Sequence, residues 1–133
     1  MTKIYCDIAD KRLIKIFNKK KIVKGFTTNP SLIRKAGARN YKSYCLELLN
    51  ITKKPISFEV FSDNEKGMIF QGNKISKWGK NVFVKVPYVN SKGHFTGKVI
   101  KELNNNKIKL NITAVYTASQ TKKILKKIDK STK

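Results

Sequence analysis

Val82-Phe83-Val84-Lys85-Val86-Pro87 is an almost unbroken apolar run, and it indicates the fold class more sharply than any other segment. A short run rich in valine and ended by proline is typical of a strand in a parallel sheet, which is covered on both faces. On either side of this run, apolar segments alternate with amphipathic helical patterns along the whole chain. This alternation predicts repeated βα units.

The predicted elements follow one another with regular spacing. We expect strands at 3–9, 22–28, 55–60, 82–87 and 109–116. We expect helices at 10–20, at 29–51 with a break at Gly37, and at 64–78, 95–104 and 118–128. In the first helix, the predicted apolar face consists of Leu13, Ile14, Ile16 and Phe17.

Strands that alternate with helices form a parallel sheet that is either doubly wound or closed into a barrel. No glycine-rich phosphate fingerprint follows the first strand, where Asp7-Ile8-Ala9-Asp10 stands, so the barrel is favoured. A full barrel has eight units, of which this chain supplies about five. We therefore predict an α/β fold, an incomplete (β/α) TIM barrel in one domain over residues 1–133.

Length and composition exclude several classes of protein. With 133 residues, of which 40% are hydrophobic, the chain can fold as one domain. No apolar stretch approaches the roughly 20 residues of a membrane span, so a membrane partner is excluded. Asp7 interrupts the first apolar stretch, unlike a secretory signal, so a cytoplasmic location is expected. Cys6 and Cys45 lack metal-ligand or redox spacing, so we expect reduced thiols and no metal.

The formal net charge of +22 raises nucleic-acid binding as a function. However, only Arg12, Arg34 and Arg39 are arginines, so 27 of the 30 basic residues are lysines. Base-reading proteins rely on arginine, and this lysine surplus is typical of A/T-rich coding. The densest basic runs, 19–21 and 122–133, are predicted to be a helix end and a basic C-terminal helix. A basic nucleic-acid-binding module therefore stays a disfavoured alternative.

Each predicted strand carries a polar residue near its carboxyl end, where a buried parallel strand should be apolar. These residues are Asp7, Thr27, Glu59, Lys85, Asn111 and Thr113, and Asn29 follows directly after the second strand. The alternation of side chains along a strand allows them to share one face. In a barrel, this location is the catalytic mouth. For any single one of them, a structural hydrogen-bonding role is the alternative.

Lys85 has the clearest chemical meaning, because it is surrounded by apolar residues. Burial disfavours the charged form of a lysine, and a neutral amine is a nucleophile toward carbonyl carbons. Lys85 is therefore a candidate for forming a Schiff base. The alternative is a structural ion pair with Glu59 or Asp7. The same carboxylates could supply the acid and base groups that iminium chemistry requires.

Five motifs in this order carry a resemblance to a known family: Cys6-Asp7-Ile8-Ala9-Asp10, Gly25-Phe26-Thr27-Thr28-Asn29-Pro30-Ser31, Ile56-Ser57-Phe58-Glu59-Val60, Val82-Phe83-Val84-Lys85-Val86-Pro87 and Leu110-Asn111-Ile112-Thr113-Ala114-Val115-Tyr116. Over almost its whole length, the chain resembles the small transaldolases and their fructose-6-phosphate aldolase relatives. The resemblance implies a TIM barrel that transfers a dihydroxyacetone unit between sugar phosphates in the pentose phosphate pathway, without a cofactor.

The resemblance also implies a role for each catalytic residue. Lys85 forms the Schiff base with the donor ketose, and Asp7 is the acid/base for the hydroxyl proton. Glu59 and Thr113 hold the catalytic water. Ile8 stands where the family usually has threonine, and Glu59 stands where aldolase-type members carry glutamine. The glutamate favours transaldolase over aldolase activity.

By the same resemblance, the substrate-binding residues are Asn29, Asn111 and Thr27. In the family, a serine and an arginine on a sixth strand hold the substrate phosphate, so these five units predict impaired phosphate affinity. A catalytically inactive barrel fragment is accordingly an alternative function. The first and fifth strands would have unpaired edges, which leaves association into a homo-oligomer open.

Overall fold

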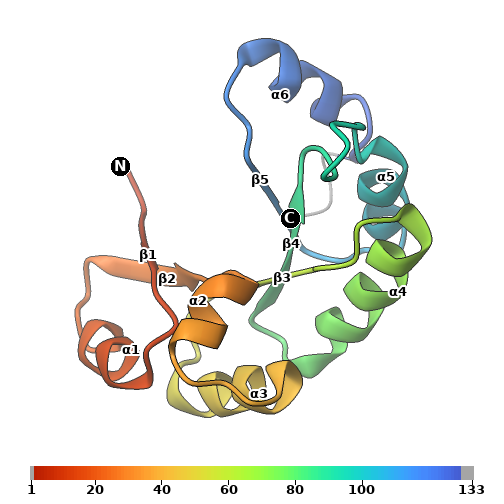
Figure 1. Cartoon of the computed structure of the whole chain (residues 1–133). Coiled ribbons are helices and arrows are strands. Elements are labelled where there is room, and N and C mark those ends of the chain that lie inside the picture. Colours follow the sequence, from red (N-terminus) through yellow and green to blue (C-terminus); the bar gives the residue numbers. More distant parts are fainter. Residues whose placement is uncertain (1, 130–133) are drawn as a thin grey trace. The chain divides into compact units, whose positions relative to one another are not determined.

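The strands and helices alternate along the chain, as the sequence predicts (Figure 1). The computed structural model describes residues 2–129 and divides into two compact units. Within this range, the first unit contains residues 2–59 and 78–82, and the second contains residues 60–77 and 83–129. Among the described residues, no helix is both long and apolar enough to cross a membrane.

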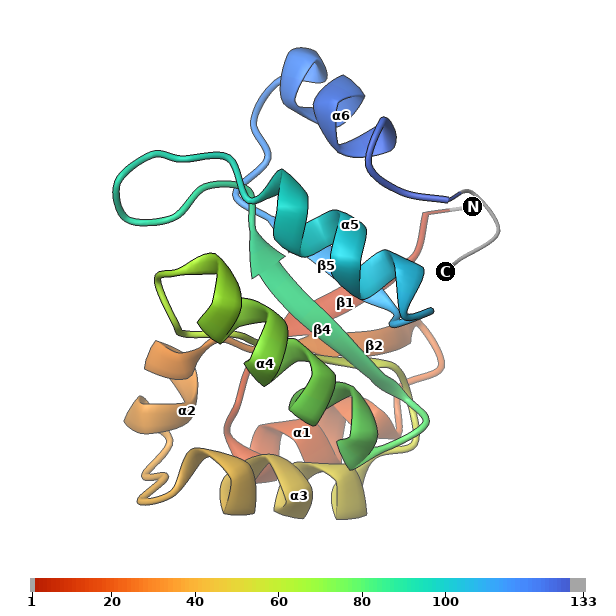
Figure 2. The same ribbon diagram turned by 90° about the vertical axis from the view of Figure 1, so that its right-hand side faces the viewer.

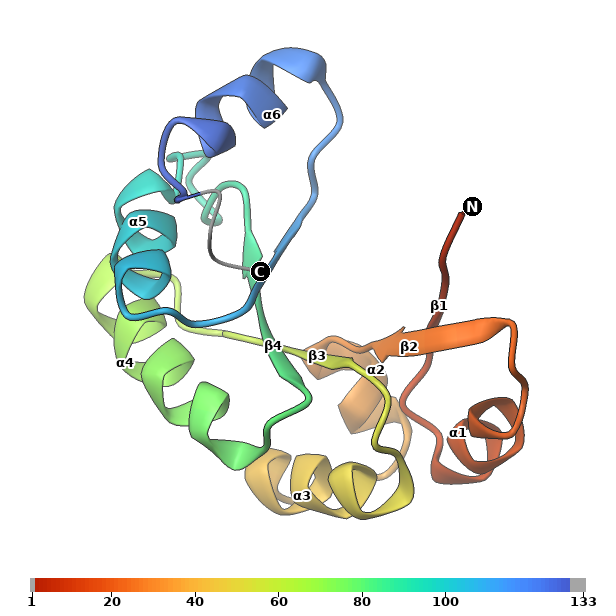
Figure 3. The same cartoon turned by 180° about the vertical axis from the view of Figure 1, so that it is seen from behind.

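The first unit is built from three parallel strands and three helices. Its elements are β1 (Ile4–Asp7), α1 (Lys11–Asn18), β2 (Val23–Thr27), α2 (Pro30–Lys35), α3 (Tyr41–Ile51) and β3 (Ile56–Glu59). The strands pair in chain order, β1 with β2 and β2 with β3. Helices α1 and α3 are neighbours, as Figure 3 shows. Phe26, Ile56 and Phe58 are completely buried in the core of this unit.

The second unit continues the pattern with two parallel strands. Its elements are α4 (Glu65–Ile75), β4 (Val82–Pro87), α5 (Gly97–Asn105), β5 (Leu110–Thr113) and α6 (Ala118–Leu125). A short 3-10 turn, Ser76–Trp78, follows α4, and Trp78 and Val82 themselves belong to the first unit. Figure 2 shows α4 and α5 side by side along β4. Val84 and Val86 are completely buried, as are Val99, Ile100 and Leu103 of α5.

The fold class predicted from the sequence is confirmed. Five strands alternate with helices, the strands are parallel, and their order in the sheet follows their order in the chain. These are the features of an incomplete (β/α) TIM barrel. The expectation of a single domain over residues 1–133 stays a prediction.

The predicted break at Gly37 in the helix 29–51 is confirmed, because Gly37 has a φ of 93° and Asn40 caps the second helix. Other boundaries differ from those expected. Strand β5 ends at Thr113 because Ala114 has a φ of 59°, which is incompatible with extended backbone. Helix α6 ends at Leu125, three residues before the predicted end of the helix 118–128. The basic run 122–133 is therefore helical over 122–125 but not over 126–129, and residues 130–133 lie outside the described residues.

The predicted apolar face of the first helix is only partly correct. Ile14 is completely buried, whereas Leu13, Ile16 and Phe17 are exposed. Helix α1 begins at Lys11, because the Asp10 carboxylate accepts hydrogen bonds from the backbone N–H groups of Arg12 and Leu13.

Candidate functional site

In the first unit, polar residues occupy matching positions at the carboxyl ends of neighbouring strands. Asp7 lies opposite Thr27, and Thr27 lies opposite Ser57. Phe26 and Phe58 alternate with these residues along β2 and β3 and are completely buried. The strands therefore have one apolar face in the core and one face that presents a carboxylate and hydroxyl groups.

The segment that follows β2 is held by hydrogen bonds to the main chain. The Thr28 hydroxyl donates a hydrogen bond of 2.8 Å to the Ser57 carbonyl oxygen. The side-chain oxygen of Asn29 accepts a 2.9 Å hydrogen bond from the Leu32 backbone N–H and caps α2. Pro30 at the first turn of α2 has the backbone angle that a helix start requires. Asn29 therefore has a structural role, in addition to any role in binding.

Glu59 is held through its backbone by a side chain from α3. The Tyr41 hydroxyl donates a 3.0 Å hydrogen bond to the Glu59 carbonyl oxygen and accepts one of 3.2 Å from the Glu59 N–H. The Tyr41 ring packs against Trp78, with ring centroids 6.2 Å apart, and Trp78 also contacts Phe58. Burial raises the pKa of the Tyr41 hydroxyl well above its usual range, so the hydroxyl keeps its proton.

The two cysteines are free thiols, as the sequence predicts. Cys45 is completely buried beside Tyr41, and burial raises the pKa of its thiol to about 12. Within residues 2–129, no group of three or more His, Cys, Asp or Glu side chains is placed to hold a metal ion.

In the second unit, Lys85 lies in the middle of an apolar strand. The residue is only 8% exposed, and Val84 and Val86 beside it are completely buried. Lys85 lies directly opposite Asn111 of β5. The Lys85 carbonyl oxygen accepts a 3.1 Å hydrogen bond from the Val60 N–H. The backbone of Lys85 is therefore held both by Val60 and by the pairing with β5. A primary amine and a side-chain amide therefore occupy neighbouring positions in the sheet.

Thr113 lies two residues beyond Asn111 on the same face of β5, opposite Pro87. The Thr113 carbonyl oxygen accepts a 2.9 Å hydrogen bond from the Tyr88 N–H, which joins the end of β5 to the residue after β4. The Thr96 hydroxyl donates a 2.6 Å hydrogen bond to the Pro87 carbonyl oxygen. These bonds fix the position where β4 ends, two residues beyond Lys85.

The loop after β4 is also tied to the loop after β3. The Ser91 hydroxyl and backbone N–H donate hydrogen bonds of 2.6 and 2.8 Å to the two oxygens of the Asp63 carboxylate. These bonds, the side-chain one first, hold the pKa of Asp63 below its usual range.

The candidate residues are thus brought together in two sets. Asp7 and Thr27 are neighbours in the first unit, and Lys85 and Asn111 are neighbours in the second. Sequence reasoning missed the contact of Tyr41 with Glu59. It also missed Asp63, because an exposed loop carboxylate has no pattern that would distinguish it.

The parallel (β/α) architecture and a lysine buried within a strand are the features of an α/β barrel-type protein that carries an amine within its sheet. The sequence matches the Transaldolase/Fructose-6-phosphate aldolase family over residues 4–131. The chain belongs to this family.

Individual relatives agree with this assignment. The chain is 37% identical over 118 residues to a probable transaldolase of Herpetosiphon aurantiacus, with 89% of this chain and 51% of the relative covered. It is 38% identical to one of Clostridioides difficile, with 89% and 52% covered. It is 36% identical to one of Methanococcus maripaludis, with 89% and 53% covered. The chain therefore spans about half the length of the curated relatives it matches.

Proposed function

We propose that this chain carries the Schiff-base chemistry of a transaldolase, which transfers a dihydroxyacetone unit between sugar phosphates. The observation that carries the proposal is the burial of Lys85 within an apolar strand, at 8% exposure, with a side-chain amide opposite it. A lysine amine is the nucleophile with which Schiff-base enzymes attack a ketone carbonyl, and the valines beside Lys85 shield it from bulk water. Family membership supports the same role.

In the proposed reaction, the Lys85 amine attacks the carbonyl carbon of the donor ketose and expels water, which forms an iminium. The C3–C4 bond of the ketose then breaks, and the iminium takes up the electron pair. Asp7 removes the proton from the C4 hydroxyl, so the leaving fragment departs as an aldehyde. The bound three-carbon carbanion attacks an acceptor aldehyde in the reverse sense, and Asp7 returns the proton.

The remaining residues have supporting roles in this proposal. Glu59 and Thr113 position the water that forms and hydrolyses the imine. Asn111, Asn29 and Thr27 bind the hydroxyl groups of the dihydroxyacetone unit. No cofactor is needed, because the iminium itself is the electron sink. The reaction belongs to the pentose phosphate pathway, in the cytoplasm.

The proposal is tested by trapping the iminium with borohydride in the presence of fructose 6-phosphate and measuring the mass of the modified protein by mass spectrometry. We expect the wild-type protein to carry a dihydroxyacetone unit, because the C3–C4 bond has broken before reduction. In Asp7→Asn, the adduct should keep the whole sugar phosphate, because the C4 hydroxyl proton is not removed. Lys85→Met should give no adduct. Lys109→Met, the matched control directly before β5, should behave as the wild type. A whole-sugar adduct in the wild type would contradict the role of Asp7.

A further inference from the structure

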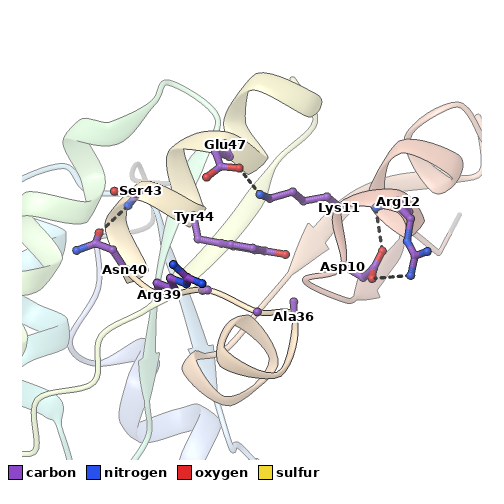
Figure 4. A pocket seen from close by; sticks show the side chains of 11 residues that line it. Asp10, Lys11, Arg12, Ala36, Arg39, Asn40, Ser43, Tyr44 and Glu47 are labelled. Atoms are coloured by element: carbon purple, nitrogen blue, oxygen red, sulfur yellow. Dashed lines mark hydrogen bonds and ion pairs between the residues drawn. The ribbon is translucent and has the colours of Figure 1, made fainter.

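The first unit contains a cavity that the proposed ketose chemistry does not use. It has a volume of about 560 Å³, within the roughly 300–1,000 Å³ typical of small-molecule sites. It lies between the start of α1, residues 36–40 and the first turns of α3 (Figure 4). Its charged and aromatic lining residues are Asp10, Lys11, Arg12, Arg39, Tyr44 and Glu47.

Both carboxylates of this cavity are already engaged by the protein. Asp10 accepts hydrogen bonds of 2.8 and 3.0 Å from the backbone N–H groups of Arg12 and Leu13. These bonds, that from Leu13 first, hold the pKa of Asp10 below its usual range, so Asp10 is a carboxylate at neutral pH. Glu47 forms an ion pair with Lys11. Neither acid is therefore placed to recognise a cationic ligand.

The cavity also has a fixed wall. The Tyr44 hydroxyl donates a 2.8 Å hydrogen bond to the Ala9 carbonyl oxygen, and the Lys11 ammonium lies 4.5 Å from the centre of the Tyr44 ring. The side-chain oxygen of Asn40 accepts a 2.9 Å hydrogen bond from the Ser43 N–H, which fixes the start of α3 next to Arg39. The backbone beside Arg39 is therefore fixed, and Arg39 enters from the side opposite α1 in Figure 4.

The distribution of arginines distinguishes this cavity from the rest of the surface. The chain has three arginines against 27 lysines, and two of the three, Arg12 and Arg39, line this one cavity of eleven residues. The third arginine, Arg34, is exposed on α2, and all other basic residues are lysines. Arg12 lies 3.8 Å from Asp10 at the rim, whereas Arg39 pairs with no carboxylate among the described residues. A guanidinium differs from an ammonium chiefly in its planar fork, which binds two oxygens of one anion.

We propose that this cavity is a binding site for the phosphate monoester group of a small molecule. Arg39 binds two phosphate oxygens through its fork, and Arg12 at the rim adds a second guanidinium. The cavity has three cations against two carboxylates, and this positive excess favours an anion. Its wall starts at Asp10, in the loop that directly follows Asp7, so an occupant would contact the segment that carries this proposed acid/base. The proposal does not depend on Schiff-base formation at Lys85.

The test is a titration of the full chain with glycerol 2-phosphate at constant ionic strength, followed by amide chemical shifts. We expect saturable shifts at Arg12 and residues 39–44. Arg39→Lys keeps the charge and removes the fork, so the dissociation constant should rise about tenfold or more. Arg34→Lys makes the same change at an exposed position on α2 outside the cavity, and should leave the constant unchanged.

Three results would overturn the proposal. One is the absence of saturable chemical-shift changes at the cavity. Changes spread over the lysines of the whole surface count as the same result, because they are the pattern of non-specific attraction to a chain of net charge +22. Another is an equal weakening in Arg39→Lys and Arg34→Lys. The third is acetate binding as tightly as glycerol 2-phosphate, which would refute the assignment to phosphate. Because Arg39 and Arg34 are exposed, both variants should stay folded.

Discussion

Replacing Tyr41 with phenylalanine should lower both the stability of the fold and the order of Glu59. The substitution keeps the ring that packs on Trp78 and removes only the hydroxyl that bonds the N–H and C=O groups of Glu59. Each intramolecular hydrogen bond contributes about 0.5–1.5 kcal/mol. Because Glu59 is half-buried, water can replace part of what is lost, so we expect the free energy of unfolding to fall by about 1–2 kcal/mol.

This change is measurable by urea denaturation. With a slope near the middle of the usual range of about 1–3 kcal/mol/M for small proteins, the midpoint should fall by roughly 0.5–1 M. Tyr116→Phe is the matched control, because Tyr116 is 85% exposed and should change the free energy of unfolding by less than about 0.5 kcal/mol. Equal midpoints for the two variants would refute the assignment of Tyr41 as the residue that holds Glu59.

The raised pKa of Tyr41 gives the same variant a pH signature. A tyrosine whose pKa is higher in the folded than in the unfolded protein stabilises the fold fully below its unfolded pKa of 10.0. This contribution is lost as the pH rises above that value, because the unfolded state releases the proton first. The stability difference between wild type and Tyr41→Phe should therefore shrink above pH 10. A difference that stays constant to high pH would contradict burial of the hydroxyl.

Three further outcomes are expected. A Cβ atom at Gly25 would lie 2.6 Å from the Pro55 carbonyl oxygen, so Gly25→Ala should destabilise the protein by about 1–3 kcal/mol in urea denaturation, and an unchanged midpoint would argue against this register. The thiol of Cys45, with a pKa of about 12, is about one part in 10⁴ thiolate at pH 8, so Ellman's reagent should label it only after unfolding. In Ser91→Ala, the carboxyl pKa of Asp63, followed by NMR, should rise toward 3.8, and no rise would contradict the Ser91 contact.

Much of the fold was predictable because its signal is local. The strand 82–87 and the alternation of strands with helices follow from hydrophobic periodicity, and both are confirmed. Periodicity shows which face of a helix is apolar but not how much of that face is covered. Ile14 was therefore predicted correctly as a core residue, while exposed Phe17 was not. The end of β5 was missed because an alanine with positive φ, Ala114, has no sequence signal.

The candidate site was predictable where it depends on the alternation of side chains along a strand. This alternation allows Lys85 and Asn111 to lie on one face of the sheet, and the register of β4 and β5 confirms that they are neighbours. The contact of Tyr41 with Glu59 spans 18 residues and joins a helix to a strand, so no local pattern reports it. The cavity around Arg39 depends in the same way on how α1 and α3 pack. The roles of the site residues in catalysis stay predictions.

The most direct test of Schiff-base chemistry is the position of the trapped adduct. The protein is reduced with borohydride in the presence of fructose 6-phosphate, digested, and mapped by mass spectrometry. We predict one modified lysine, Lys85, out of the 27 in the chain. Modification spread over many lysines, or no modification in protein that circular dichroism shows to be folded, would contradict the account.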